Sequence, residues 1–361
     1  SLATELTMRG HTVRVAEKND RTGLQPRAKT TNIRTMTHMR RWGLAGEMRN
    51  RSPLSADFPR HVTFRTGLFD EPIYTFHDAF CATPQRYDAF PEHAEFIPQY
   101  FVEGILADNV AAEPLANLTF GTELIGFEQD QDGVTGRLKD RASGEETNVR
   151  ARFLAGADGG RSSIRERLGI AMNGKHDIGF HTTLILRIPG LNDDPELKPA
   201  LFHWIIDTEA ACIIGPMDKG DLWFWGKTAG KDVSTETLLG YARRVIGKDY
   251  PLEVVIRDDW TVNSLIADHY REGRVFLAGD ACHLHSPFGG HGMNQGIGDA
   301  VDLGWKLSAA LQGWASEGLL DSYTVERQQA HKAIVASATK NVASLSEHFA
   351  DPDLSGTGEV R

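Results

Sequence analysis

The stretch RVFLAGDACHLHSPFGGHGMNQGIGDAVDLGWKLSAAL, residues 274–311, carries the strongest signal for the fold. It opens with an apolar run at residues 275–278, whose length and composition are typical of a buried parallel strand. Gly279 and Asp280 end that strand, and five glycines follow between residues 289 and 298. Apolar residues at helical spacing come next. The segment therefore predicts a strand, a glycine-rich loop and a helix, in that order.

This order of elements predicts a binding site for an anionic or electron-rich group. The first N–H groups of a helix have no intrahelical acceptor and point outward, and glycine lets the backbone approach a ligand closely. The alternative is a loop whose glycines serve only tight turns. Asp280, Asn294 and Asp299 lie among the glycines, and their presence favours the ligand site.

The composition excludes several classes of function. Of 361 residues, 24% are charged and 40% hydrophobic, and the net charge is −10. That charge argues against a nucleic-acid partner and against binding to an anionic membrane. No apolar run is long enough for a membrane span, and no signal peptide opens the chain. Three cysteines lie far apart without metal-site spacing, which favours a cytoplasmic protein without disulfides.

The first residues predict part of a dinucleotide-binding βαβ unit. A helix at residues 1–8, capped by Gly10, precedes a β-branched strand at residues 12–16. Glu17 stands at the carboxyl end of that strand, where an acidic residue binds ribose hydroxyls in such units. A solvated surface glutamate is the other interpretation. The first strand and its G-x-G-x-x-G turn would precede residue 1, so we expect this sequence to be N-terminally truncated.

Two further regions complete the α/β interpretation. A helix is expected at residues 96–106, and residues 118–149 predict a β-meander whose strands include 118–127 and 134–138. Residues 152–160 repeat the pattern of an apolar strand that runs into an aspartate, here Asp158. Residues 178–227 alternate as antiparallel strands do and are rich in aromatic residues. A helix at 235–246 and a strand at 253–262 follow them. We interpret this block as a sheet that forms one wall of a pocket.

Three segments together resemble the FAD-dependent aromatic hydroxylases, the class A flavoprotein monooxygenases that include p-hydroxybenzoate hydroxylase and phenol hydroxylase. They are VRVAE with PRA (residues 13–17 and 26–28), GADG (residues 156–159) and the long motif at residues 279–302. The resemblance covers nearly the whole chain in order. It implies an α/β fold, in which a Rossmann-like FAD-binding domain carries an inserted antiparallel-sheet substrate domain.

On this resemblance the chain divides between the two domains. The FAD-binding domain would take residues 1–70, 96–177 and 266–346, the last range including the C-terminal helices. The substrate domain would take a segment at 71–95 and the sheet at 178–265. A polar tail would occupy residues 347–361.

The resemblance also assigns roles in cofactor binding. Glu17 would bind the adenosine ribose, Arg27 and Gln99 would lie near the FAD pyrophosphate, and Asp158 belongs to a motif associated with both FAD and NAD(P)H. The remaining positions come from the long motif: Asp280 for the ribityl chain, Pro287 for the flavin ring beside the substrate, and Gly292, Met293 and Asn294 for the pyrimidine end of the isoalloxazine. No metal site is expected.

The implied reaction is the hydroxylation of a phenolic or polyketide-type aromatic substrate through a flavin C4a-hydroperoxide. FAD would be the cofactor, with NADPH or NADH and O2 as co-substrates and a homodimer as a possible assembly. Pro287 and His203 are the candidate catalytic residues, and His181 and Tyr241 are further candidates for the base that deprotonates a phenol. Two alternatives stay open: another flavoenzyme of this fold (an epoxidase, halogenase or oxidase), or a catalytically silent FAD-binding relative.

Overall fold

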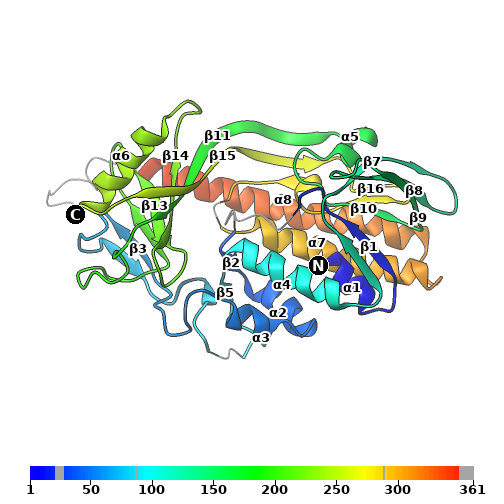
Figure 1. The fold of residues 1–361 in the computed structure, drawn as a ribbon, viewed down its shortest axis with the longest axis horizontal. Helices are drawn as coiled ribbons and strands as arrows, with labels where there is room; N and C mark the ends of the chain where they lie inside the picture. The colour runs from blue at the N-terminus through cyan, green and yellow to red at the C-terminus, as the bar shows by residue number, and fades with distance from the viewer. Residues whose placement is uncertain (21–27, 86–87, 288, 349–361) are drawn as a thin grey trace.

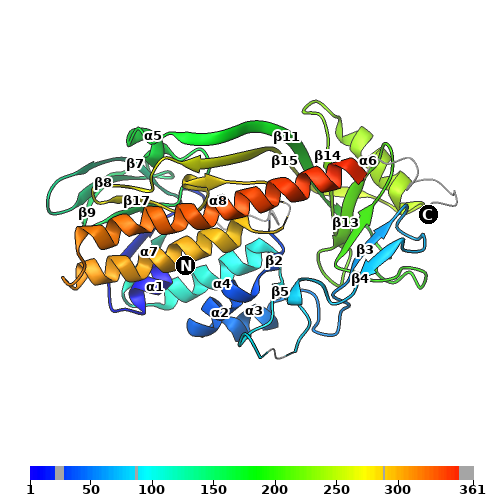
Figure 2. The ribbon, with the colours of Figure 1, turned by 180° about the vertical axis from the view of Figure 1, so that it is seen from behind.

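The structure is a computed structural model that describes residues 1–20, 28–85, 88–287 and 289–348, with side chains as far as residue 341. The molecule is elongated, as Figures 1 and 2 show. A helical layer with small sheets forms one end, and a large sheet under α6 (Thr235–Ile246) forms the other. The long strands β11 (Met172–Arg187) and β15 (Glu253–Ala267) run between the two ends.

Helices cover the smaller sheets at the first end. The remaining helices have the following bounds: α1 Leu2–Thr7, α2 Ile33–Arg41, α3 Ala45–Asn50, α4 Gln99–Ala112, α5 Ser163–Arg167, α7 Gly292–Leu311 and α8 Glu317–His348. Two short 3-10 turns are η1 (Ala79–Cys81) and η2 (Gly279–Ala281). In Figure 2, α8 lies in front of α7 and reaches toward the large sheet.

Four small sheets belong to this end. Parallel pairing joins β1 (Val13–Ala16) to β6 (Ala116–Thr119), and β10 (Leu154–Gly156) to β17 (Val275–Leu277). The other strands pair antiparallel: β16 Arg271–Glu272 on β17, β2 Thr30–Thr31 on β5 Glu95–Phe96, and β7 Thr122–Gln129, β8 Val134–Asp140 and β9 Glu146–Ala151 in one meander. The parallel strand expected at residues 275–278 is confirmed as β17.

The large sheet has eight strands in the order β18-β15-β11-β14-β13-β12-β3-β4. Those not yet introduced are β3 Val62–Arg65, β4 Tyr74–Phe76, β12 Phe202–Ile205, β13 Cys212–Pro216, β14 Leu222–Thr228 and β18 His283–Leu284. Most neighbours pair antiparallel, as the alternating residues of the aromatic block predict, and β3 pairs parallel with β12. Because β18 immediately precedes the glycine-rich loop, that loop leaves directly from the edge of the large sheet.

The two faces of the large sheet have different neighbours. Leu184, Trp223 and Trp225 pack with α6 in one fully buried cluster. The alternate residues, among them Ile185 and Phe224, pack on the opposite face, with Tyr100 of α4 beside them. This alternation follows from the two-residue period of a strand. The sheet therefore presents an aromatic face toward the helical end.

Three expectations from the sequence need correction. Residues 118–127 are not one strand: Gly121, with φ of +64°, separates β6 from β7, and the two strands join different sheets. Phe96 belongs to β5 rather than to the helix that follows, which begins at Gln99. β11 and β15 extend beyond the ranges expected, because each pairs with the other along almost its whole length.

None of the helices in the described part of the chain combines the length and the apolar character needed to cross a bilayer.

Packing of α1 on α7 gives a test of the helical end. A Cβ added at Gly304 of α7 would lie 2.6 Å from the Cβ of Glu5, which sits on α1. We expect Gly304→Ala to lower the free energy of unfolding by about 2 kcal/mol, because one helix must move. Gly240→Ala is the matched control, since Gly240 lies exposed in α6 with nothing within 4 Å of its added Cβ. Gly240→Ala should raise the free energy of unfolding by up to about 1 kcal/mol. If urea unfolding shows the same loss of stability in both variants, the close packing of α1 on α7 is contradicted.

Candidate active site

The glycine-rich loop brings a strand end and a helix start into backbone contact. Gly279, with φ of +62°, follows β17, and an added Cβ at Gly296 would lie 3.4 Å from the Cα of Gly279. Side chains at these two positions would separate α7 from the strand. The N-cap residue of α7, His291, makes no side-chain capping hydrogen bond. The first amides of α7 therefore have no intrahelical acceptor and no side-chain cap.

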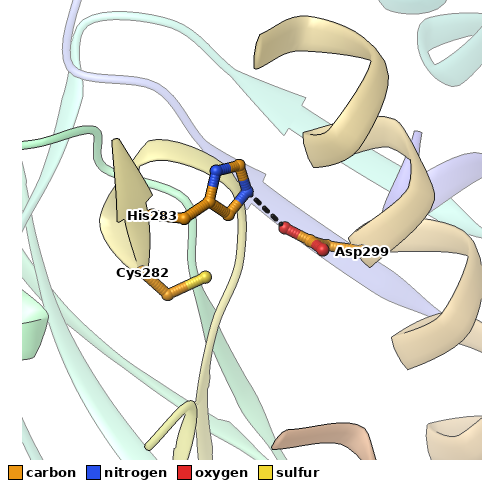
Figure 3. A group of neighbouring side chains, drawn as sticks. All are labelled: Cys282, His283 and Asp299. Atoms are coloured by element: carbon orange, nitrogen blue, oxygen red, sulfur yellow. Dashed lines mark hydrogen bonds and ion pairs between the residues drawn. The ribbon is translucent and has the colours of Figure 1, made fainter. Parts of the chain in front are cut away.

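Asp299 is the buried centre of this arrangement (Figure 3). Its Oδ2 accepts hydrogen bonds from the Gly279 amide and from Nε2 of His283, each at 2.9 Å. Its Oδ1 lies 2.7 Å from Nε of Arg327 and 3.0 Å from Nε2 of His331. Burial would raise the pKa of this carboxyl, but the hydrogen bonds from the two histidines outweigh burial and hold its pKa well below the usual range.

These contacts, together with the chemistry of Cys282, disfavour metal binding by the cluster. Cys282, His283 and Asp299 do offer ligand atoms within 4.8 Å of one another. Both oxygens of Asp299, however, already accept from N–H donors. Burial also raises the pKa of the Cys282 thiol well above its ordinary value, which disfavours the thiolate that a metal needs.

Asn294 fixes the start of α7 to the strand β2. Its Nδ2 donates to the carbonyls of Thr30 at 2.9 Å and Gly290 at 2.7 Å. Its Oδ1 accepts from the Asn32 amide at 3.0 Å and from Oγ1 of Thr35 at 2.7 Å. All four hydrogen-bonding positions of the amide are thus used within the protein. The loop, β2 and the start of α2 form one rigid unit.

Lys29 connects this unit to the aromatic face of the large sheet. Its Nζ lies 3.4 Å from the centre of the Phe224 ring and 5.7 Å from that of Phe202. Phe202 in turn packs edge-to-face on Phe224 and Phe96, with ring centres 5.4 and 5.5 Å apart. Sequence reasoning missed Lys29, because a lysine in a polar loop gives no signal of its later burial.

The other residues proposed for cofactor binding lie at element ends. Glu17 follows β1, and its Oε1 accepts from the amide and side chain of Asn19 at 2.8 Å. Asp158 follows β10 and accepts from the Ile164 amide at 3.2 Å. Gln99 begins α4, and its amide donates to the Ala28 carbonyl at 2.8 Å. Arg27 lies outside the described residues.

The residues of the long motif that are proposed to bind the cofactor differ in their exposure. Asp280 and Pro287 are exposed, Gly292 and Met293 are half-buried, and Asn294 is buried. The structure therefore brings Pro287, Gly292, Met293 and Asn294 to one end of α7, beside the exposed Asp280. Glu17 and Asp158 sit at other strand ends.

The candidate bases lie on different faces of the large sheet. His203 is fully buried on β12, where its Nδ1 contacts Oγ1 of Thr63 at 3.0 Å and its ring stacks on Trp223. It therefore shares the α6 face with Trp223, and Tyr241 of α6 packs there too. His181 packs on Trp260. It lies on the aromatic face, because it is four residues before Ile185 in the same strand and alternate residues share a face.

A surface hollow of about 380 Å³ lies elsewhere, lined by residues of α2, α3 and the segment before β5. Its cations are already neutralised. Arg40 lies 3.5 Å from Glu92, and Arg49 also pairs with Glu92. None of the lining residues belongs to the glycine-rich loop, so this hollow is separate from the site at α7.

Comparison with known proteins identifies the family. The profile of the FAD binding domain family matches residues 1–338. The chain belongs to the FAD-dependent aromatic hydroxylases. It is 34% identical to the 2,4-dichlorophenol 6-monooxygenase of Cupriavidus pinatubonensis over 88% of its own length and 55% of that enzyme.

Solved structures of this hydroxylase family have the same fold. The rebeccamycin biosynthetic enzyme RebC with reduced flavin matches with a TM-score of 0.90 and 31% identity, over 99% of this chain and 67% of that one. Aklavinone-11 hydroxylase with FAD and aklavinone matches with a TM-score of 0.82 and 29% identity, over 97% and 66%. The chain spans 55–62% of the length of three curated relatives that it matches.

Unpaired polar atoms around the start of α7 fit a flavin of the kind that this family binds. Among the buried side-chain atoms that have no hydrogen-bond partner in the described part of the chain are Nε2 of His285, Oγ of Ser286 and Oγ1 of Thr31. Two of them lie in the loop that precedes α7, and the third lies on β2, which Asn294 ties to the start of α7. Because buried polar atoms rarely stay unpaired, a ligand with polar edges suits this position.

Removal of the Asp299 charge should destabilise the protein strongly. We expect Asp299→Asn to lower the free energy of unfolding by about 3 kcal/mol, because Arg327 loses its buried partner. Glu236→Gln is the control, since Glu236 forms an exposed 3.0 Å pair with Arg243. Its effect should stay within about 0.5 kcal/mol. Equal losses in both variants, measured by urea unfolding, would show that Asp299 has no special structural role.

His203 should make stability depend on pH. Burial, followed by the charge of Arg65, lowers the pKa of His203 to about 3. The unfolded chain takes up a proton near the ordinary pKa while the folded chain does not, so stability falls as the pH is lowered from neutral. The loss is up to about 1.4 kcal/mol per pH unit for this group. His203→Phe should flatten this slope, and His176→Asn, at an exposed position, should not. Unfolding curves between neutral and acid pH measure both.

Proposed function

We propose that this protein hydroxylates a phenolic or polyketide-type aromatic compound, with FAD as cofactor and NADPH or NADH and O2 as co-substrates. The observation that carries the proposal is the junction at α7. There the first helix amides have no side-chain cap, and unpaired atoms of His285 and Ser286 lie in the preceding loop. Asn294 ties this helix start to β2, and Lys29, just before β2, reaches the aromatic face of the large sheet. The relatives whose names describe hydroxylation of phenols and aklavinone support the same reaction.

Residues around α7 would hold the cofactor. The amides of Gly292, Met293 and Asn294 would bind the pyrimidine edge of the flavin, and a helix N-terminus supplies roughly half a positive charge there. Bound FAD supplies the electron transfer and oxygen activation. The protein adds a fixed dipole that favours negative charge on the ring without any side-chain cation. Asp299 and Asn294 keep that dipole in place through their hydrogen bonds to Gly279 and Thr30.

The remaining contacts to FAD are assigned by position. Glu17 would bind the adenosine ribose, Asp280 the ribityl chain, and Gln99 with Arg27 the pyrophosphate. Asp158 would contribute near both FAD and NAD(P)H, and Pro287 would contact the flavin ring beside the substrate. The position of these carboxylates supports the roles, since open α/β sheets bind ligands at the carboxyl ends of their strands. Asp158 and Asp280 are exposed there, and Glu17 is half-buried.

The large sheet would bind the aromatic substrate and exclude water. Phe202 and Phe224 pack edge-to-face on the side of the sheet that Lys29 reaches from β2. Apolar walls slow the wasteful release of peroxide, because water has little access to the reacting atoms. The same surface selects a flat aromatic compound over a sugar or a peptide.

Turnover of the FAD-loaded protein tests the proposal. A panel of phenols and polyketide aromatics should include compounds that accelerate NAD(P)H oxidation and yield a product carrying one oxygen atom from labelled O2. Release of hydrogen peroxide should fall with the better substrates. Products that contain halogen, or NAD(P)H oxidation that yields peroxide alone, would favour another flavoenzyme of this fold. A flavin that stays oxidised with every aromatic would indicate a catalytically silent relative.

A further inference from the structure

Lys29 is a partly buried cation without a polar partner among the described residues. Its side chain lies against the rings of Phe224 and Phe202. Other buried lysines are paired: Lys306 lies 2.9 Å from both Asp302 and Glu326, and is fully buried. Lys227 donates to the Ala211 carbonyl at 3.3 Å. Because an unpaired buried ammonium is costly, this side chain favours either the neutral amine or the arrival of an anionic partner.

The backbone places Lys29 between the cofactor unit and the aromatic face. The carbonyl of the preceding residue, Ala28, accepts from the Gln99 amide, and the carbonyl of the next, Thr30, accepts from Asn294. Both bonds fix the chain around Lys29 to the starts of α4 and α7. The side chain then extends from this fixed backbone onto Phe224 of β14. An aromatic substrate lying on this face would meet the amine.

The charged and titratable groups around Lys29 leave its ammonium unneutralised. On β5, Glu95 lies 3.7 Å from Arg60 and is committed to it. On β11, burial and then the charge of Lys29 lower the pKa of His181 to about 4. On α4, burial raises the pKa of Tyr100 to about 12. On the sheet strands, Lys227 of β14 lies over Tyr241 instead, and His203 of β12 lies on the α6 face.

Burial lowers the pKa of Lys29 to about 7. In a large fraction of molecules Lys29 is therefore a neutral amine at physiological pH and can accept a proton. The ammonium that results can then pair with an anion. A base with a pKa near the working pH is the most effective one for proton transfer. His181, with a pKa of about 4, is a weaker base by comparison. His203 and Tyr241 lie on the other face of the sheet.

We infer that Lys29 takes the proton of the substrate's phenolic hydroxyl and then holds the resulting phenolate as an ion pair. This inference rests on the proposed function. The O–H bond breaks, the oxygen keeps the electron pair, and the proton forms the third N–H bond of the ammonium, so the step needs no oxidant or reductant. The phenolate is a more electron-rich ring than the phenol and so a better acceptor of an electrophilic oxygen. The substrate class is thereby narrowed to aromatics with a free hydroxyl.

The ionisation of a bound coloured phenol tests this role without turnover. We would titrate 4-nitrophenol into the FAD-loaded protein over a range of pH, without NAD(P)H, and record the phenolate band. Wild-type protein should lower the pKa of the bound probe by about one unit or more, because a cation lies beside its oxygen. Lys29→Met should abolish this shift, and Lys29→Arg should retain it. Lys227→Met is the matched control, since it removes a half-buried lysine from the α6 side.

The rate of hydroxylation separates proton transfer from charge alone. We expect Lys29→Met to slow hydroxylation of a phenol roughly 100-fold near neutral pH, with flavin content unchanged. Lys29→Arg should still pair with the phenolate. It should stay slow below the pKa of the bound phenol, because a guanidinium stays protonated and cannot accept the proton of the phenol. Both variants should recover partly as the pH rises toward the pKa of the free phenol. Lys227→Met should keep the wild-type rate and profile.

The outcomes distinguish this inference from the proposed function. A wild-type enzyme that hydroxylates phenols, while its Lys29→Met variant keeps the spectral shift and the pH profile, overturns the role of Lys29 alone. An equal loss of the shift in Lys227→Met also overturns it. A wild-type enzyme whose flavin no phenol or polyketide engages overturns the proposed function, and this inference with it.

Discussion

The buried carboxylate of Asp299 is the constraint on which the rest of the site depends. It joins the turn after β17, the imidazole of His283 and the side chains of Arg327 and His331 from α8. These groups come from three segments that are separate in the sequence. Because one ion satisfies all of them, the strand end, α7 and α8 can adopt only one relative position. The orientation of the α7 amides follows from that position, and with it the electrostatics of any ligand bound there.

A second polar side chain, Asn294, fixes the start of α7 to the segments near the N-terminus of the chain. Its four hydrogen bonds tie the helix start to β2 and α2, which lie some 260 positions earlier in the chain. Lys29 immediately precedes β2 and reaches the large sheet from there. Two polar side chains of α7 therefore organise both the cofactor side and the substrate side of the proposed site. Neither would need to touch the substrate to affect it.

Much of this arrangement is visible in the sequence, and the reasons for the exceptions are physical. The strand, glycine loop and helix at residues 274–311 could be predicted because each leaves a local pattern of apolar period and glycine. The helix at 235–246 likewise has a local signal, with Ser234 as cap and Gly247 at its end. The break at Gly121 could not be predicted, because the strands on either side are equally β-branched and only their partners differ. The burial of Lys29 and the side of the sheet on which His203 lies could not be predicted either. Both depend on contacts with residues distant in the sequence.

The long pairing of β11 with β15 has a mechanical consequence. Their ladder runs from Met172 opposite Ala267 to Arg187 opposite Glu253, so the two ends of the molecule are joined by a twisted ribbon and not by a flexible linker. A rotation of one end against the other must twist that ribbon. Its register shifts between Lys175 and Gly179, where Asp177 has a φ of +50°, and again between Ile185 and Leu186. The first shift interrupts the pairing for longer, so twisting of the ribbon should be easiest there. The orientation of the helical end relative to the large sheet therefore depends on how stiff this two-stranded ribbon is.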